Sequence, residues 1–390
     1  MRICFVVSQF APVVGGTEGQ IRDLASGLAA RGHTVEVVTQ PVPGTPRRDR
    51  VDGVAVARAL RTVQGGPLFG MTYGLSVALA LWHRRAADLF QVAFAHWDAA
   101  VAGWLRRRLD RPVVVRVANT SAEGDLGRLR GSRYWPLVRS WDGPTVGTLI
   151  RAIQRCDAFV VPVPHMAATL SREGFARERI VEIGNGVDQW RFRPPTREER
   201  ATARAALGVG RERVVVTVGR LDPLKGTGDL IAALPRLPKD TRLVVVGDGT
   251  EREPLLADAR ALGVTRQVQI AGWTRDVLPF LWAADVFALP SHTEGMPNAL
   301  LEAMSAGLPC VATRVGAVAD LLDAGGAGVL VAPGDPPALA AAMAAVLEDQ
   351  DGASRLGAAA RARVEARHTL DEMLTRYETL YQRLTCRAAA

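Results

Sequence analysis

The chain has 390 residues, of which 48% are hydrophobic and only 23% are charged, and this composition excludes an intrinsically disordered protein. The length exceeds what a single hydrophobic core ordinarily serves, so two domains are expected. Its four cysteines are far apart and form no C-x-x-C pair. That spacing argues against a disulfide framework or a zinc site and favours a reduced, cytosolic protein.

The first half is expected to form a parallel, doubly wound sheet. An apolar strand over 2–8, a glycine loop, a helix over 20–31 and a strand over 34–39 together make a βαβ unit. Further strands are expected at 54–57, 89–95, 112–117, 158–162 and 180–183, with helices at 75–85, 99–109, 146–155 and 165–173. The segment 192–196, F-R-P-P-T, is typical of a linker.

The pattern restarts in the second half, which predicts a second α/β domain with a parallel sheet. Strands are expected at 214–218, 242–246, 268–271, 286–290, 310–313 and 328–331. Helices are expected at about 227–236, 277–283, 337–348, 353–366 and 370–385, and residues 321–328 have the composition of a glycine-rich turn.

The net charge of +8 is unevenly distributed. Residues 1–195 carry 26 Lys and Arg against 16 Asp and Glu, together with six of the eight tryptophans. A basic, Trp-rich half indicates an anionic partner, such as a phospholipid surface or a phosphorylated acceptor, although an Arg-rich proteome would explain it equally well. No cleavable signal peptide is expected, and the most apolar long stretch, 73–82, has about half the length of a bilayer span.

A long loop over 119–140 contains several arginines and aromatic residues, and loops of this length are usually functional. Tyr134, Trp135 and Trp141 are expected to grip an acceptor or to lie on a membrane. Packing of these aromatic side chains against the domain edge is an equally good interpretation.

The segment 291–308 reads S-H-T-E-G-M-P-N-A-L-L-E-A-M-S-A-G-L and follows a buried strand. Glu294 is expected in the loop, and Glu302 about one turn into a helix that starts near Asn298. Carboxylates accept hydrogen bonds from hydroxyl groups, and the N–H groups at a helix start can meet an anion. The segment therefore suits a hydroxyl-rich ligand that carries phosphate, whereas a single isolated Glu would more simply be a solvated side chain.

The loop G-R-L-D-P-L-K-G at 219–226 follows the strand at 214–218. The chain contains 46 Arg but only two Lys, Lys225 and Lys239, which suggests that a compact ammonium is needed in this loop. Arg220 and Lys225 could clamp a diphosphate and stabilise its charge as it leaves. The alternative is a solvated basic loop.

With these two segments the chain resembles the retaining glycosyltransferases of family 4, whose GT-B fold has two facing Rossmann-like domains with a cleft between them. N-G-V-D at 185–188, the loop P-V-V-G-G-T-E at 12–18 and the pair Gly32-His33 also match. The resemblance spans nearly the whole chain and is tightest over 214–316. It implies an acceptor-binding domain over 1–193, a nucleotide-sugar donor domain over 194–368, and a helix over 369–390 that packs back toward the first domain.

The resemblance implies transfer of a sugar from a nucleotide-diphosphate sugar to an acceptor hydroxyl, with retention by front-face attack. Arg220 and Lys225 would bind the diphosphate, Glu294 the donor sugar and Glu302 the ribose. Further donor contacts would come from Gly15 and Gly16, where a Cβ would collide, and from the backbone at Gly295, Met296, Asn298, Ala299 and Leu300. No cofactor or metal is expected, because Arg, Lys and the helix N-terminus supply positive charge and no D-x-D motif stands beside a strand.

The chain departs from the family pattern after the strand at 112–117, where Ala118 replaces a frequent histidine. His96, in F-A-H-W, is a candidate catalytic residue because it is expected to end a strand, although a lone histidine there is more often structural. The other candidates to substitute for the missing histidine are Asn119, Thr120, Glu123 and Asp125.

A second departure follows the strand at 310–313, where the usual paired glycines and Glu appear as Gly316-Ala317 and Asp320. Two other functions on the same fold therefore stay open, an epimerase or hydrolase of nucleotide sugars and an inactive nucleotide-sugar-binding protein. The leading hypothesis is a cytoplasmic, membrane-peripheral transferase of cell-envelope, polysaccharide or glycolipid biosynthesis. Its acceptor would be a glycan, glycolipid or small molecule, and no nucleic acid is expected as a partner.

Overall fold

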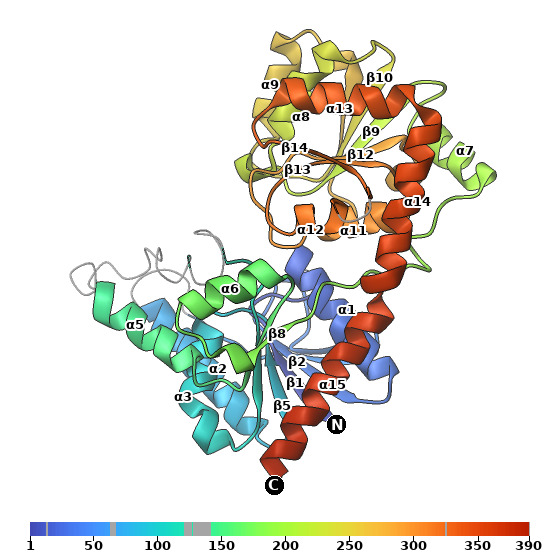
Figure 1. The fold of residues 1–390 in the computed structure, drawn as a ribbon. Coiled ribbons are helices and arrows are strands. Elements are labelled where there is room, and N and C mark those ends of the chain that lie inside the picture. The colour runs from blue at the N-terminus through green and yellow to red at the C-terminus, as the bar shows by residue number, and fades with distance from the viewer. Residues whose placement is uncertain (13–14, 63–67, 121–126, 128–141, 324–325, 390) are drawn as a thin grey trace. The chain divides into compact units, whose positions relative to one another are not determined.

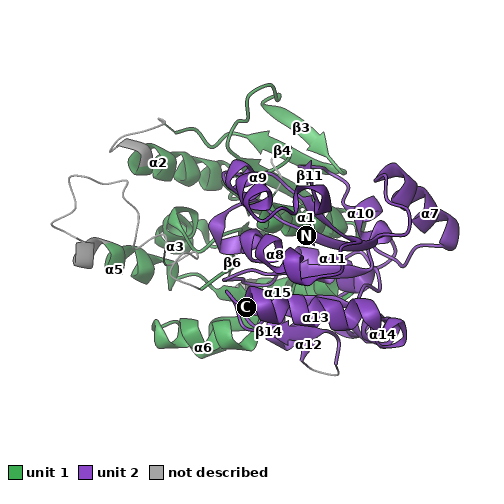
Figure 2. Cartoon of the chain, turned by 90° about the horizontal axis from the view of Figure 1, so that it is seen from above, with its two compact units in different colours: residues 1–185, 370–390 green, residues 186–369 purple. Residues whose placement is uncertain are grey.

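The computed structural model describes residues 1–12, 15–62, 68–120, 127, 142–323 and 326–389. Two compact units are present, one formed by residues 1–185 with 370–390 and the other by residues 186–369 (Figures 1 and 2). The chain therefore passes into the second unit earlier than the expected boundary at 193, and its C-terminal helix belongs to the first unit.

The first unit is built on an eight-stranded sheet with the order β3-β4-β2-β1-β5-β6-β7-β8. Every neighbouring pair is parallel except β3 and β4. The strands are β1 (Arg2–Val6), β2 (Thr34–Thr39), β3 (Arg48–Val51), β4 (Val54–Arg58), β5 (Leu89–Val92), β6 (Val113–Arg116), β7 (Ala158–Val161) and β8 (Ile180–Glu182).

Strand β3 was not expected from the sequence, because its R-D-R-V residues are mostly exposed and show no apolar alternation. It forms an antiparallel hairpin with β4 through Asp52 and Gly53, which both have positive φ. An Asp-Gly pair is the preferred centre of a tight two-residue hairpin turn. That dipeptide is the sequence signal that could have identified the hairpin.

Two helical layers cover the sheet of the first unit. The strand order runs outward from β1 and β5, so right-handed crossovers place α1 on one face and α2, α3 and α5 on the other. Helix α3 accordingly packs against α2 and α5, while α1 packs against α15 (Figure 1). The helices of this unit include α1 (Gly16–Ala30), α2 (Leu68–His83), α3 (Trp97–Leu109), α5 (Asp142–Ile153), α6 (Pro164–Arg172) and α15 (Leu370–Ala389).

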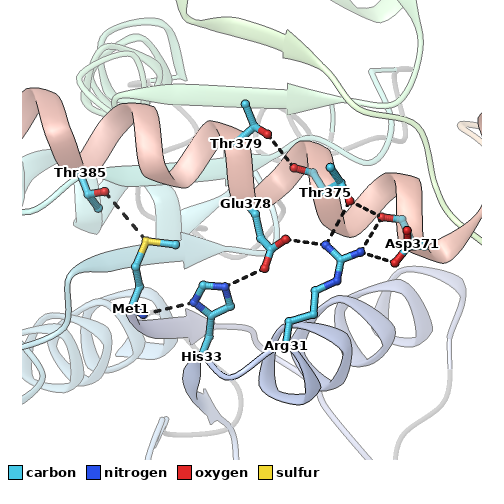
Figure 3. Close-up of polar contacts among 8 residues, drawn as sticks. All are labelled: Met1, Arg31, His33, Asp371, Thr375, Glu378, Thr379 and Thr385. Atoms are coloured by element: carbon cyan, nitrogen blue, oxygen red, sulfur yellow. Dashed lines mark hydrogen bonds and ion pairs between the residues drawn. The ribbon is translucent and has the colours of Figure 1, made fainter.

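Helix α15 is fastened to the first unit by buried aromatic rings and by a polar cluster (Figure 3). Tyr381 is fully buried, and its hydroxyl donates to Gln91 Oε1 on β5 at 2.7 Å. His33 Nε2 lies 2.8 Å from Glu378 Oε1, and Arg31 pairs with the same carboxylate. His33, noted in the sequence as part of a Gly-His pair, thus has a structural role in holding the helix.

The second unit is built on a six-stranded sheet, entirely parallel, with the order β11-β10-β9-β12-β13-β14. Its strands are β9 (Arg213–Val218), β10 (Thr241–Val246), β11 (Val268–Gly272), β12 (Val286–Leu289), β13 (Cys310–Thr313) and β14 (Val329–Val331). The helices of this unit include α7 (Arg197–Ala206), α8 (Thr227–Ala233), α9 (Arg252–Ala261), α10 (Leu278–Ala283), α11 (Asn298–Ser305), α12 (Val318–Leu322), α13 (Pro336–Glu348) and α14 (Gln350–Arg367).

Two helices of the second unit differ from the expected pattern. Helix α7 was not expected, yet Thr196 and Glu199 form a capping box at its start, a signal that T-R-E-E carries in the sequence. Helix α12 occupies part of the stretch expected to be a glycine-rich turn, because Val318, Leu321 and Leu322 bury one apolar side.

The four cysteines are free, and Cys4, Cys156 and Cys310 are buried. Burial raises the pKa of the Cys4 thiol to about 12, so this side chain acts as a small apolar group. Within the described ranges, no helix combines the length and the apolar character that a membrane crossing requires.

Candidate active site

The strand order of the second unit reverses between β9 and β12, which are adjacent and parallel. Ligands of open α/β sheets bind at the carboxyl ends of the strands that flank such a reversal. The loop 219–226 follows β9, and the loop 290–297 follows β12. The two segments that the sequence singled out therefore meet at the place where such a sheet binds its ligand.

Lys225 and Glu294 join these two loops. Lys225 Nζ lies 2.7 Å from Glu294 Oε1, and the Ser291 hydroxyl donates to the same oxygen at 2.7 Å. The Glu294 side chain is only 9% exposed and that of Lys225 26%, so the ion pair is largely withdrawn from water and stronger than a surface pair. The sequence predicted the lysine and the carboxylate but assigned no role to Ser291, which orients the carboxylate.

The same two loops also meet through their backbones. The His292 N–H donates to the Leu224 carbonyl at 2.8 Å, and His292 Nε2 lies 2.8 Å from Asp229 Oδ2 on α8. Gly226 has a φ of +61°, and a Cβ built on it would lie 2.2 Å from the Pro290 carbonyl oxygen. A glycine is required here because any side chain would force the β9 and β12 loops apart.

Replacing Gly226 by alanine is expected to lower the free energy of unfolding by about 2–4 kcal/mol, because the left-handed backbone and the contact with Pro290 both oppose a methyl group. Urea unfolding would measure the loss. Gly263→Ala is the matched control, since Gly263 has a φ of +70° but nothing within 4 Å of its Cβ. Equal losses in the two variants would contradict the packing of the two loops.

Helix α11 follows the loop 290–297 and carries Glu302. Its N-cap, Pro297, has an extended backbone and makes no side-chain cap. The start of a helix is in general a favourable place for an anion. Glu302 is partly buried in the middle of the helix. The side chains of Met296 and Leu300 are buried, whereas those of Asn298 and Ala299 are half-buried.

The loop after β13 supports the Glu294 segment from behind. The Ala317 N–H donates to the Gly295 carbonyl at 2.9 Å. Gly316 has a φ of +50°, and a Cβ there would lie 1.9 Å from the Glu294 carbonyl oxygen. Of the two positions at which the family usually has glycine, only 316 has a geometry that requires it. Position 317 accommodates an alanine.

Arg220 differs from Lys225 in its surroundings. Its side chain is 69% exposed and pairs with Asp222 Oδ2 at 2.9 Å. Asp222 also accepts from the Leu224 N–H at 3.1 Å and so starts the short turn Pro223–Lys225. Arg220 thus lies largely in water, and a charged ligand would compete with Asp222 for its guanidinium.

The remaining predicted site residues belong to the first unit. Gly15 is the N-cap of α1 with an extended φ of −147°, and Gly16 begins the helix. His96 is the N-cap of α3 and lies beyond the end of β5, so the expectation that it ends a strand is wrong. Because β1, β5 and β6 are adjacent and parallel, the loops that carry Gly15, His96 and Ala118 lie at one edge of this sheet.

Two buried arginines at the same edge were not expected from the sequence. Arg58 ends β4 and donates from Nη2 to the Ala11 carbonyl at 2.8 Å, which fixes the loop after β1. Arg116 ends β6 and donates to Asn185 Oδ1 at 2.7 Å, at the point where the chain leaves this unit. An arginine that closes an apolar strand is the signal that could have identified both.

Several expectations concern residues outside the described ranges, namely Glu123, Asp125, Tyr134, Trp135 and Trp141. Within those ranges, no group of three or more His, Cys, Asp or Glu side chains is placed to hold a metal ion.

Comparison with known proteins agrees with this geometry. Residues 212–349 match the family model described as glycosyl transferases group 1, and residues 14–191 match that of glycosyltransferase family 4. The chain is 32% identical to a glycogen synthase of Mycobacterium tuberculosis over 93% of its own length and 90% of that protein. It is 31% identical to a D-inositol 3-phosphate glycosyltransferase of Xylanimonas cellulosilytica, over 96% of its own length and 93% of that protein.

Solved structures show the same fold. HepE of Anabaena, crystallised with UDP and glucose, superposes with a TM-score of 0.80 at 22% identity, covering 97% of this chain and 99% of that one. Sucrose-phosphate synthase of Thermosynechococcus elongatus gives 0.82 at 24% identity, covering 99% of each chain. Two parallel-sheet domains of this kind form the GT-B fold, and the chain belongs to the group 1, family 4 glycosyltransferases.

Proposed function

We propose that this glycosyltransferase moves a sugar from a nucleotide-diphosphate sugar to an acceptor hydroxyl. The observation that carries the proposal is the Lys225–Glu294 pair at the switch point of the second unit, where a cation and an oriented carboxylate lie 2.7 Å apart. A nucleotide-diphosphate sugar offers a diphosphate that the cation can bind and sugar hydroxyls that can donate to the carboxylate. HepE has been crystallised with UDP and glucose and with UDP-glucose, which supports the same donor class.

Each group of the site has a part in the proposed reaction. Lys225, Arg220 and the start of α11 bind the diphosphate and stabilise its charge as the bond to the sugar breaks. Glu294 holds the donor sugar and Glu302 the ribose. Because these cations and dipoles supply the positive charge, the proposed reaction is independent of metal.

The proposed stereochemical outcome is retention by front-face attack. Glu294 Oε1 accepts from both Lys225 and Ser291, which suits a carboxylate that binds hydroxyl groups better than one that attacks carbon. The proton of the acceptor hydroxyl then passes to the departing phosphate. NMR of the product during turnover would identify the anomer, and an inverted product would exclude this mechanism.

The donor is expected to raise the thermal midpoint of the protein, because a ligand that binds only the native state stabilises it by about 2.7 kcal/mol at a hundredfold excess over Kd. A panel of UDP-, GDP- and ADP-sugars in differential scanning fluorimetry, with and without EDTA, would measure this. The variant Glu302→Gln should reduce the shift, whereas Glu253→Gln, on the exposed side of α9, should not. The absence of a shift with every nucleotide sugar would contradict the donor site.

Two other functions would produce different results in the same experiments. An epimerase or hydrolase of nucleotide sugars would consume donor without acceptor, and an inactive binding protein would show the thermal shift without turnover. Transfer that requires an acceptor excludes both. The proposal places the enzyme in the cytoplasm, acting in cell-envelope, polysaccharide or glycolipid biosynthesis on a glycan, glycolipid or small-molecule acceptor, with peripheral contact between the basic first half and an anionic membrane.

A further inference from the structure

Helix α2 carries large apolar side chains on both of its sides. Tyr73, Val77 and Leu81 are buried in the first unit. The opposite side is exposed to water, by 61% at Met71, 62% at Leu75, 50% at Leu79 and 43% at Trp82. Steps of four, four and three residues place these four side chains in one stripe along the helix. A continuous apolar stripe on the surface of a folded unit is the mark of an interaction site.

Helix α3 packs beside α2 (Figure 1) and adds a further exposed apolar side chain, that of Trp104. Trp104 is 43% exposed, and the outward positions that follow it along the chain are arginines. The guanidinium of Arg85 lies 5.0 Å from the centre of the Trp82 ring. We call the α2–α3 face the surface formed by the apolar side chains of Met71, Leu75, Leu79, Trp82 and Trp104 and the basic side chains of Arg85, Arg107, Arg108 and Arg111.

Charge decides which partner this face fits. Helix α2 contains no acidic residue, and the only acidic residue of α3 is the buried Asp98. The four arginines of the face outnumber the one exposed carboxylate beside them, that of Asp110 at the end of α3, so the face is positively charged. Exposed Leu, Met and Trp side chains can enter the headgroup region of a membrane, and neighbouring arginines are attracted to anionic lipids. A second copy of the chain would bring the same positive charges against themselves.

We propose that the α2–α3 face is the surface by which this protein lies on an anionic membrane. The stripe enters the headgroup region, and the arginines meet lipid phosphates. The inference gives a surface to the peripheral contact proposed above, and it does not depend on the transferase reaction or on the donor site.

Flotation of the full-length protein with lipid vesicles tests the proposal. Binding to phosphatidylcholine vesicles that contain phosphatidylglycerol is expected, with much weaker binding to phosphatidylcholine alone. The double variant Leu75→Gln/Leu79→Gln should weaken binding by at least about tenfold, since two leucines lose their burial in lipid. Glutamine keeps the helix propensity of leucine, so the fold should be retained. The matched control is Leu262→Gln, because Leu262 is 45% exposed in the second unit.

Removal of the positive charge of single arginines tests separately whether they contact lipid phosphates. Arg107→Gln and Arg108→Gln should each weaken binding to the anionic vesicles about fivefold at low salt, and should leave binding to phosphatidylcholine unchanged.

Four results would overturn the proposal. The first is wild-type protein that does not float with anionic vesicles, and the second is a double variant that floats like wild type. The third is a dimer in light scattering that dissociates in Leu75→Gln/Leu79→Gln, which would make the face an interface between copies. A fall of many degrees in the thermal midpoint of the double variant would show that the stripe packs inside the chain, and would overturn it as well.

Discussion

The variant Lys225→Met is expected to lower kcat for sugar transfer by about 10²–10³-fold, the loss typical of removing one preorganised charge from developing negative charge. Methionine keeps the length of the side chain but cannot neutralise the departing diphosphate. Steady-state rates of nucleoside diphosphate release, with donor and acceptor both present, would measure the effect.

The second lysine of the chain provides the control for this experiment. Lys239 is exposed in the turn before β10, so Lys239→Met removes the same charge from the same unit. It should leave kcat within about twofold of wild type, as surface substitutions usually do. Lys225→Arg should retain part of the activity, because the charge stays but the planar guanidinium fits the pocket of a compact ammonium poorly. If Lys225→Met and Lys239→Met had the same rate, Lys225 would have no part in the reaction.

The placement of Lys225 and Glu294 at one edge of the second sheet could be predicted from the sequence because local pattern and topology agree there. An apolar run that ends in polar residues marks the carboxyl edge of a parallel strand, and Lys225 and Glu294 each follow such a run. Their pairing could not be read from the sequence, because 69 positions separate them and only the strand order brings β9 beside β12. Ser291 shows the same limit, since its role depends on the direction of one hydroxyl group.

Other parts of the structure could not be predicted from the sequence, because the local signal was weak or a stronger pattern pointed elsewhere. Strand β3 is charged and exposed, so only its Asp-Gly turn indicates a hairpin. His96 is expected from the sequence to end a strand, yet β5 stops at Val92 and His96 is the N-cap of α3. The buried Arg58 contradicts the usual exposure of arginine, and its burial follows from a carbonyl of a distant loop.

The exposed stripe of α2 shows how a correct pattern can lead to an incomplete interpretation. The run of apolar residues predicted a helix, and the burial expected of such residues holds for only one of its sides. The exposure of the other side could be recognised only from the structure, because a sequence alone does not show which elements cover a helix.

The variant Glu294→Gln is expected to lower kcat/KM for the donor by about 10²-fold, since an amide accepts hydrogen bonds from sugar hydroxyls more weakly than a carboxylate and gives Lys225 no counter-charge. Initial rates over a series of donor concentrations would separate the two parameters. The matched control, Glu253→Gln, lies on the exposed side of α9 and should behave as wild type.

The double variant Lys225→Met/Glu294→Gln tests whether the two residues act as one unit. Because Nζ and Oε1 are in direct contact, the combined loss should be smaller than the product of the two single losses, by an interaction energy of about 1–3 kcal/mol. Strictly additive losses would mean that the contact has no part in the reaction.

The single variant Glu294→Gln separates two mechanisms that both retain the anomeric configuration, front-face attack by the acceptor and attack by the Glu294 carboxylate. If Glu294 only holds the sugar, the wild-type enzyme incubated with donor alone should keep its intact mass, and Glu294→Gln should retain slow transfer. If the carboxylate attacked the anomeric carbon and released the nucleoside diphosphate, the protein would gain the mass of one glycosyl group, and Glu294→Gln would be inert. The bonds from Lys225 and Ser291 to Oε1 favour the first result, because they lower the electron density with which that oxygen could attack.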